Sequence, residues 1–325
     1  MLRSYTIILI CLTPASLASQ GARVSVSGRV LRGGRDTVPL ANAPVVLHRI
    51  TRTSGGPIDS SRTDAKGRYR FEIAKVDSGS IYLVSTTFDS LAYVSTPVGI
   101  TGRPAAHVDD IVAYRTTANA PPIRLERRLL TIASAATEGT REVLEILELQ
   151  NTGQTARITA DTLAPTWAGR IPAGAGQTRG GQGDISPEAM RFRHDSIIVL
   201  APIPPGPVKQ LSYAYTLTAG TRILRIPIDQ MTDNLNLLIE DTAAVVTAPR
   251  LEALGVQELE QRHYAAYRAG PLTPGDRVEI QLPSTGFRAQ AVLPYVIAVV
   301  AGGMVIALVW ALRKKPSAVS GQPSV

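Results

Sequence analysis

Short runs in which apolar and polar residues alternate follow one another along most of this chain, separated by glycine, proline and aspartate. RVSVSGRVL at 23–31 has the two-residue period of a half-buried strand, and APVVLHRI at 43–50 is a second apolar run. The stretch 60–73 predicts a β-hairpin that turns at Asp64 to Gly67, since glycine readily adopts the positive φ that such a turn requires. After the turn, three apolar side chains share one strand face and predict a core: Tyr69, Phe71 and Ile73.

Three of these segments carry a family resemblance. VSGRV at 26–30, APVVL at 43–47 and TDAKGRYRF at 63–71 follow one another in the order that is typical of the carboxypeptidase regulatory-like domain, which residues 21–115 resemble. The resemblance implies a transthyretin-like or immunoglobulin-like β-sandwich of about seven strands. It also implies a non-catalytic accessory or interaction module, because the peptidase domain after which the family is named is absent from the sequence.

The alternating pattern continues after residue 115. Residues 116–122 (TTANAPP) predict a linker, and residues 123–287 predict a second β-sandwich. The fold class expected is therefore mainly β, with two tandem β-sandwich domains. Further strands are predicted at 81–88, 91–97, 108–114, 196–202, 208–217, 222–227, 236–241, 243–248 and 277–282.

Three stretches of the second block are less regular. EVLEILEL at 142–149, followed by Asn-Thr-Gly, favours a strand buried on both sides, with a helix as the alternative. The stretch 172–182 is rich in glycine, alanine and glutamine and predicts a mobile loop. Residues 254–267 predict a loop or a short helix.

The amino terminus resembles an export signal. Residues 1–20 contain Arg3, an apolar stretch and then small residues, which is the order of a secretory signal peptide. Cys11 is the only cysteine and lies inside this segment, so the exported protein is expected to have no disulfide and no thiolate metal site.

The carboxyl terminus predicts a membrane anchor. The uncharged run Ala291–Leu312 is long enough to cross a bilayer as one helix, and Tyr295 and Trp310 lie near its ends, where aromatic rings prefer the headgroup level. A basic cluster marks the end that remains in the cytoplasm: Arg313, Lys314 and Lys315. The expected product is a single-pass membrane protein with a periplasmic or other extracytoplasmic body and a short cytoplasmic tail, 313–325.

Composition narrows the functional classes. Hydrophobic residues make up 44% and charged residues 18% of the 325 positions, which excludes wholesale disorder. The net charge of +8 is scattered through strands and turns and forms no basic stripe with interleaved aromatic residues. Together with the export signal, this predicts no binding of nucleic acid.

No stretch carries a recognisable reaction centre. The four histidines, His48, His107, His194 and His263, lie outside any catalytic motif, and the sequence contains no nucleophile elbow, zinc helix, P-loop or dinucleotide fingerprint. The pairs Asp109–Asp110 and His194–Asp195 are the nearest approach to metal ligands. Two adjacent acids supply too few ligands alone, and the neighbours His194 and Asp195 would face opposite ways in a strand. The sequence therefore predicts no catalytic residue, no metal and no cofactor.

Aromatic residues provide the remaining candidates. Trp167, Tyr213 and Tyr215 are a candidate binding surface for a glycan or a peptide, although packing in the core is the default expectation for such residues. Tyr264 and Tyr267 share a face if their segment is helical.

The function expected from all of this is binding or scaffolding by a membrane-anchored exported protein of bacterial type, without catalysis. Its expected partners are membrane lipid along Ala291–Leu312 and a protein in or at the membrane. Two alternatives remain: an accessory subunit of a larger membrane complex, such as a cytochrome maturation or energy-transducing assembly, and a carbohydrate-binding or adhesion module.

Overall fold

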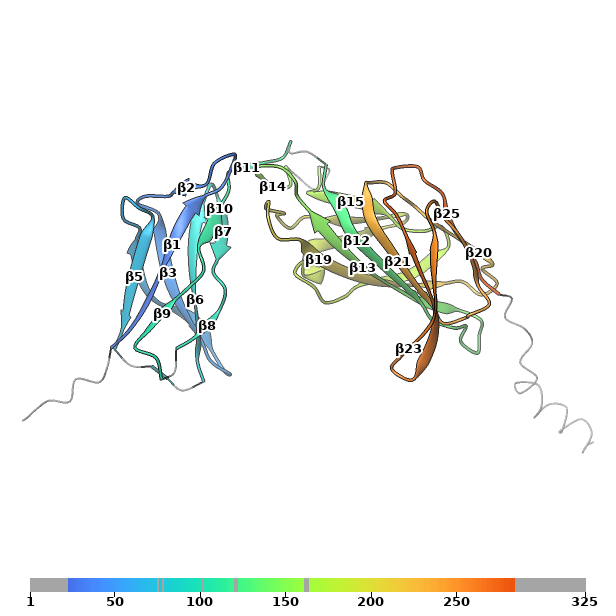
Figure 1. Cartoon of the computed structure of the whole chain (residues 1–325), viewed down its shortest axis with the longest axis horizontal. Helices are drawn as coiled ribbons and strands as arrows, with labels where there is room; N and C mark the ends of the chain where they lie inside the picture. Colours follow the sequence, from blue (N-terminus) through green and yellow to red (C-terminus); the bar gives the residue numbers. More distant parts are fainter. Residues whose placement is uncertain are drawn as a thin grey trace, which may run out of the picture. The chain divides into compact units, whose positions relative to one another are not determined.

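A computed structural model describes residues 23–74, 76–77, 79–100, 102–119, 122–160 and 164–283. In these residues every regular element is a strand except the 3₁₀ helix η1 (Pro187–Ala189), which confirms the predicted mainly β class. The chain divides into two compact units (Figure 1). We call Met1–Ala120 with Gly153–Arg157 the first unit, and Pro121–Thr152 with Ile158–Val325 the second unit.

The predicted terminal segments lie outside the described residues. They are the export signal 1–20, the span 291–312 and the tail 313–325, with the anchor residues Tyr295, Trp310, Arg313, Lys314 and Lys315. Within the ranges given above, no helix has the length and apolar character needed to cross a bilayer. The membrane anchor therefore stays a prediction.

The first unit contains two five-stranded sheets. One sheet is built around β1 (Val24–Arg32), which pairs with four other strands: β2 (Val38–Pro39), β5 (Arg68–Ile73), β9 (Ala105–His107) and β10 (Ile111–Ala113). The other sheet contains β3 (Pro44–Ile50), β4 (Gly55–Arg62), β6 (Ile81–Phe88), β7 (Leu91–Val94) and β8 (Val98–Gly99). Apolar side chains of both sheets, such as Val26, Phe71 and Val84, form one buried cluster, which fits a β-sandwich.

The turn at Asp64 to Gly67 joins two sheets and is not the predicted hairpin. Gly67 has a φ of 72°, as its position in the turn predicts, and its N–H donates to the carbonyl oxygen of Asp64 at 2.9 Å. However, β4 pairs with β3, whereas β5 pairs with β1. Apolar alternation predicts that a strand covers a core, but it does not determine which strand becomes the neighbour.

The first unit is completed by a segment from later in the chain. β11 (Thr116–Thr117), at the start of the predicted linker, pairs in parallel with β14 (Ala156–Arg157). The N–H of Ala156 also donates to the carbonyl oxygen of Arg115 at 2.7 Å. The first unit is therefore discontinuous in sequence.

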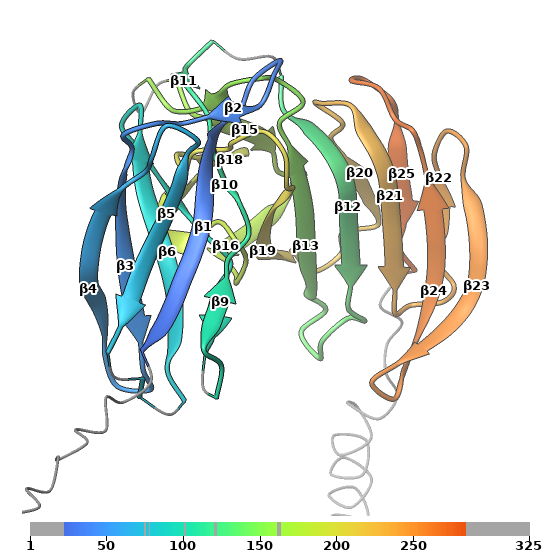
Figure 2. The same ribbon diagram turned by 60° about the vertical axis from the view of Figure 1, so that its left-hand side comes forward.

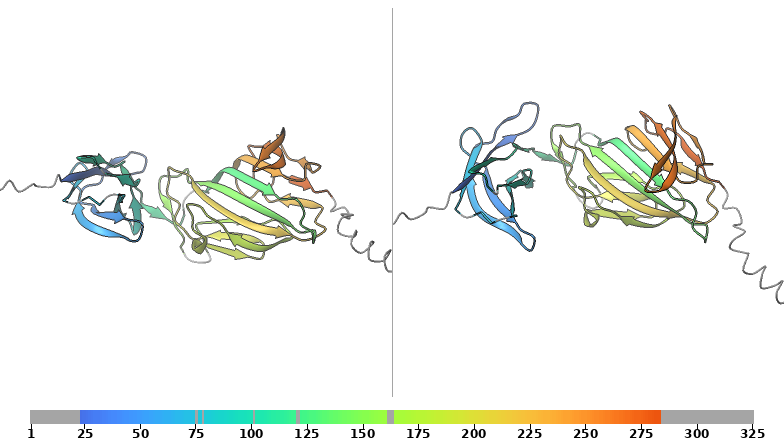
Figure 3. Two further views of the ribbon diagram at one scale, coloured as in Figure 1. Left: turned by 90° about the horizontal axis from the view of Figure 1, so that it is seen from below. Right: turned by 60° about the horizontal axis from the view of Figure 1, so that its bottom comes forward.

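The second unit contains one large sheet and two small ones (Figures 2 and 3). The seven-stranded sheet has the order β16 (Ala175–Gly180), β19 (Lys209–Leu217), β13 (Arg141–Gln150), β12 (Arg124–Ile132), β21 (Thr232–Ile239), β24 (Arg262–Ala269) and β23 (Glu252–Leu259). The first small sheet has the order β15 (Trp167–Arg170), β18 (Ser196–Val199) and β17 (Met190–Arg193). The second has the order β20 (Ile223–Ile226), β25 (Val278–Gln281) and β22 (Val245–Thr247). Side chains from all three sheets share one apolar core.

Two less regular stretches adopt structures other than those predicted. Residues 175–180, within the predicted mobile loop, form the edge strand β16, because their main-chain groups pair with β19. Residues 252–269 form the β23–β24 hairpin and not a loop or helix. Its two-residue turn, Glu260 and Gln261, has positive φ at both positions, which is typical of tight hairpins.

The strand β13 is correctly predicted, but it is not buried on both sides. Its residues alternate between buried and more exposed positions, so one face covers the core. Glu145 shares the buried face with Val143 and Leu147, whereas Leu144 is exposed on the other face. Placing the acidic side chain inside requires a buried partner.

Candidate functional site

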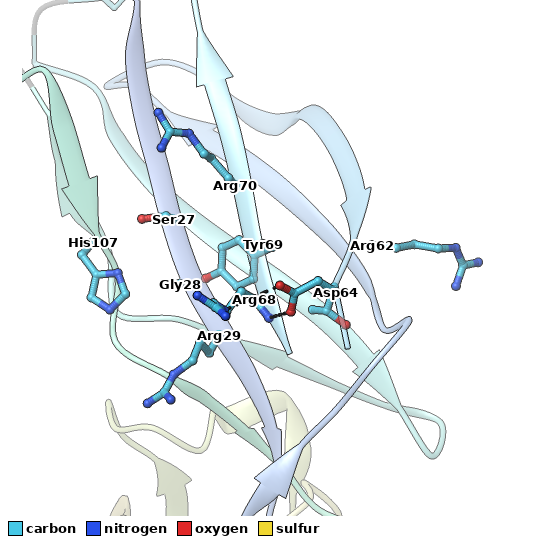
Figure 4. Close-up of a pocket in the computed structure, with 10 residues that line it drawn as sticks. Ser27, Gly28, Arg29, Arg62, Asp64, Arg68, Tyr69, Arg70 and His107 are labelled. Atoms are coloured by element: carbon cyan, nitrogen blue, oxygen red, sulfur yellow. Dashed lines mark hydrogen bonds and ion pairs between the residues drawn. The ribbon is translucent and has the colours of Figure 1, made fainter. Parts of the chain in front are cut away.

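An open cavity of about 510 Å³ in the first unit is lined mainly by polar and basic side chains (Figure 4). The antiparallel pairing of β1 with β5 places Arg29 opposite Arg68 and Ser27 opposite Arg70. The parallel strand β9 then places His107 beside Ser27. Arg62, from the end of β4, completes the set of four lining arginines, which we call the arginine cavity.

Three of these arginines form ion pairs with carboxylates. The pairs are Arg29–Asp110 at 2.5 Å, Arg68–Asp64 at 3.6 Å and Arg70–Glu72 at 2.6 Å. Arg62 instead donates to the carbonyl oxygen of Asn42 at 2.8 Å. The side chains of Arg29, Arg68 and Arg70 are half or more exposed, so water screens these pairs and the guanidinium groups can exchange partners.

Tyr69 forms a neutral floor for the arginine cavity. Its ring lies over Gly28, where a Cβ atom would be only 2.5 Å from the Tyr69 hydroxyl oxygen, so the packing requires glycine. This hydroxyl is buried and has no hydrogen-bond partner among the described residues. Burial raises the pKa of Tyr69, and the negative charge of Asp110 raises it further.

The turn beneath the cavity carries the negatively charged side chain of Asp64, which is bound by main-chain groups of the same turn. The main-chain N–H groups of Arg68 and Lys66 both donate to the Asp64 carboxylate at 2.8 Å. These bonds, that from Arg68 first, lower the pKa of Asp64. Asp64 therefore serves mainly to fix the turn, and the arginines determine the sign of the charge that the cavity presents.

Strand pairing explains why these arginines do not stand out in the sequence. Arg29 belongs to the first predicted strand, whereas Arg68 and Arg70 follow the Asp64–Gly67 turn. Their alternation with Tyr69 and Phe71 was the available signal, because it places both arginines on the solvent face of β5. Only the pairing of β1 with β5 adds Arg29 to that face.

A charged pair lies inside the core of the second unit. Arg128 Nη2 is 2.7 Å from Glu145 Oε2, and the two side chains are 5% and 0% exposed. Arg128 also donates to the carbonyl oxygen of Pro227 at 2.7 Å, and the Tyr215 hydroxyl donates to Glu145 at 2.9 Å. These additional hydrogen bonds help to offset the cost of removing both charges from water.

This buried network is structural. Burial is the largest single influence on the pKa of Arg128 and lowers it, but the charge of Glu145, the neighbouring Tyr213 and Tyr215 hydroxyls and the hydrogen bond to Glu145 together raise this pKa above its ordinary value. Burial first, and the charge of Glu145 second, raise the pKa of Tyr213 and Tyr215 well above the ordinary value. The adjacent cavity of about 10 Å³ is no larger than the roughly 10–15 Å³ that a single water molecule requires, so it has no room for a substrate.

The three aromatic residues of the predicted binding surface belong to this core. Trp167, Tyr213 and Tyr215 are 5%, 1% and 0% exposed. Tyr213 and Tyr215 share a strand face, as predicted, and their rings stack with centroids 6.2 Å apart. That face covers the core, so none of the three rings offers an exposed platform to a glycan or peptide.

A second open cavity, of about 570 Å³, lies on the face of the seven-stranded sheet that is turned away from the core. Leu144 and Tyr264 contribute to it, with an ion pair between Arg179 and Glu142 along one side. Tyr264 and Tyr267 do not share a face, because three positions along the strand β24 place them on opposite sides of the sheet. This cavity thus combines an apolar floor with charges of both signs.

The two predicted acidic ligands engage separate partners. Asp110 pairs with Arg29, and Asp109 accepts a hydrogen bond from the Thr96 hydroxyl at 2.6 Å. Their adjacency in sequence therefore does not produce a shared cation site.

The four histidines are dispersed: His48 lies in β3, His107 in β9, His194 in the turn between β17 and β18, and His263 in β24. His48 Nε2 lies 2.8 Å from the Ser85 hydroxyl oxygen. In the part of the chain that the structure describes, no three His, Cys, Asp or Glu side chains gather as metal ligands would.

Comparisons with known proteins assign no family. No family model matches the chain, and no curated protein matches it. The major plantain pollen allergen Pla l 1 is 17% identical over 28% of this chain and 92% of the allergen, with a TM-score of 0.22. An M1 zinc metallopeptidase from Deinococcus radiodurans is 8% identical over 49% of this chain and 42% of the peptidase, with a TM-score of 0.30. The chain thus spans less than half the length of that peptidase.

Proposed function

We propose that this protein is a membrane-anchored, extracytoplasmic binding protein without catalytic activity, and that the arginine cavity binds carboxylate groups of an acidic protein segment. The gathering of Arg29, Arg68 and Arg70 on one sheet face carries the proposal, because planar guanidinium groups match carboxylates geometrically. Carboxylate ligands would compete with the weak, exposed intramolecular pairs described above.

We further propose that the first unit is a carboxypeptidase regulatory-like domain. The two-sheet arrangement of its strands and the positive φ of Gly67 support this assignment. In this reading the domain has been retained as an interaction module on an exported protein, which agrees with the predicted signal and span at 1–20 and 291–312.

The glycan alternative has less support than the protein-partner proposal. Its sequence argument depended on an exposed set of Trp167, Tyr213 and Tyr215, all of which lie in the core. Membership of a larger membrane complex remains a prediction that is compatible with binding of an acidic protein segment.

The test is binding of a fluorescent hexaglutamate peptide to the full-length protein in uncharged detergent, followed by fluorescence anisotropy at low salt. We expect Arg68→Gln/Arg70→Gln to weaken binding roughly tenfold, since each exposed contact contributes up to about 1 kcal/mol and about 1.4 kcal/mol is tenfold. The matched control is Arg49→Gln, which removes an exposed, paired arginine from the other sheet of the same unit. Equal affinities for the double variant and the wild type, or no binding at all, would contradict the proposal.

A further inference from the structure

The outward face of the three-stranded sheet β20–β25–β22 carries two exposed aliphatic side chains, Ile223 and Val245. Ile223 and Val245 both lie opposite Gln281, on either side of it, so the three residues form a row across the sheet. The side chains of Ile223 and Val245 are 46% and 56% exposed. Their neighbours along the strands, Leu224 and Val246, are buried, so the row points away from the core. We call the two aliphatic residues Ile223 and Val245, with the polar Gln281 between them, the aliphatic row.

Basic groups lie on the same face, next to the aliphatic row. Arg225 lies opposite Glu279, two residues along each strand from Ile223 and Gln281. Arg277 also contacts the Glu279 carboxylate, at 2.9 Å, so two arginines share one negative charge. Both arginine side chains are well exposed. The face therefore combines exposed aliphatic groups with a net positive charge.

The chain leaves the second unit beside the aliphatic row. The N–H of Leu282 donates to the carbonyl oxygen of Arg222 at 2.8 Å. The carbonyl oxygen of Pro283 accepts a hydrogen bond of 3.1 Å from Arg141, which is buried and also pairs with Asp241 at 2.7 Å. The end of the described chain is thus held in place two residues after Gln281.

The predicted membrane span begins shortly beyond this point. Residues 284–290 separate Pro283 from Ala291, and the eight steps along an extended chain reach at most roughly 29 Å. The exit of the second unit therefore has to lie within that distance of the bilayer. This step rests on the membrane anchor that forms part of the proposed function.

We propose that this face docks on the lipid surface, with the aliphatic row at the headgroup level and Arg225 and Arg277 near lipid phosphates. Aliphatic groups bordered by arginine are the composition that interfacial membrane binding uses. The tether keeps the face within reach of the bilayer at all times, so even weak contacts would be populated. Docking would hold the second unit in one orientation on the membrane.

The test uses single cysteines in the full-length protein after Cys11→Ser, since Cys11 is the only native cysteine. Val245→Cys probes the aliphatic row. Met231→Cys is the control, because Met231 lies at the end of β21 that is away from the chain exit. It directly precedes Thr232, the first residue of β21, whereas Asp241, just after the other end of the strand, pairs with Arg141 at the exit. Met231 is also exposed, at 38%. Each variant is labelled with a polarity-sensitive fluorophore and reconstituted into vesicles of phosphatidylcholine and phosphatidylglycerol that carry a headgroup quencher.

We expect the label at position 245 to be quenched at least about twofold more than the label at 231, and to show blue-shifted emission. Equal quenching at both positions in protein that floats with the vesicles would overturn docking and leave the anchor intact. Failure to float would overturn both the anchor and the docking that rests on it. Lipid-independent shielding of position 245, by a second copy or another protein, would also overturn the proposal.

Discussion

Replacing Glu145 with glutamine tests the physical account of the second unit most directly. The substitution preserves the size of the side chain but removes its charge, and it leaves the Arg128 guanidinium buried with a neutral partner. Breaking a buried pair by removing one member costs about 3–5 kcal/mol. At about 2–4 °C per kcal/mol for a domain of this size, the unfolding midpoint of the second unit should fall by roughly 6–20 °C.

Trp167 is a suitable probe, because it is buried in the same core. Its fluorescence, recorded after Trp310→Phe removes the other tryptophan, follows unfolding of the second unit. The matched control is Glu148→Gln in the same strand, where the carboxylate pairs with the exposed Arg127 at 3.1 Å. Loss of that surface pair should cost at most about 1 kcal/mol.

A rescue variant separates loss of charge from loss of shape. The rescue variant combines Arg128→Met, Glu145→Leu and Tyr215→Phe. It removes both charges and the Tyr215 hydroxyl, which donates a hydrogen bond to Glu145. Apolar replacement of a whole buried network is often neutral or stabilising, so this variant should recover most of the lost stability. The reasoning is refuted if Glu145→Gln costs no more than Glu148→Gln, or if the triple variant is as unstable as the single one.

Three further predictions concern the first unit and are read by calorimetry or by hydrogen exchange of β5. Gly67→Ala should destabilise the unit by about 1–3 kcal/mol, and by more than Gly79→Ala does. Both glycines have positive φ, but only at Gly67 would a Cβ atom meet the main chain, at 2.4 Å. Equal losses of stability in the two variants would contradict this. Gly28→Ala should be destabilising and partly rescued by Tyr69→Phe, which removes the atom nearest to the new Cβ; strict additivity in the double-mutant cycle would argue against this contact. Because the pKa of Asp64 is lowered in the folded state, its stabilising contribution is present above about pH 4 and lost as the pH falls through the lowered pKa. The difference between wild type and Asp64→Ala should therefore shrink on acidification, and a difference that is independent of pH would exclude this role.

Local alternation predicted much of the β structure. The strand expected at 81–88 is found with the same limits, and the one expected at 208–217 begins one residue later, because both have the regular alternation or β-branched content of strands. The errors arose where long-range pairing decides the outcome. Residues 175–180 have few apolar side chains, and only the neighbouring β19 makes them a strand.

The sites were harder to predict than the strands, for a related reason. Glu145 is in phase with Val143 and Leu147, and reading this period strictly would have placed it inside. Sequence alone does not supply its partner Arg128, which comes from the neighbouring strand β12. Likewise, Tyr213 and Tyr215 were assigned to one face correctly, but the identity of that face depends on the two small sheets that cover it.

The first unit is formed by two separate segments of the chain, and the second segment is synthesised only after part of the second unit. β14 lies at Ala156–Arg157, after both β12 and β13 have been synthesised. When translation has reached residue 120, the first unit still lacks the strand that pairs with β11. Its maturation must therefore overlap in time with synthesis of the second unit, so a chaperone or protease acting during synthesis would meet an open strand edge at β11. For the same reason, transplanting the first unit into another protein requires both of its segments.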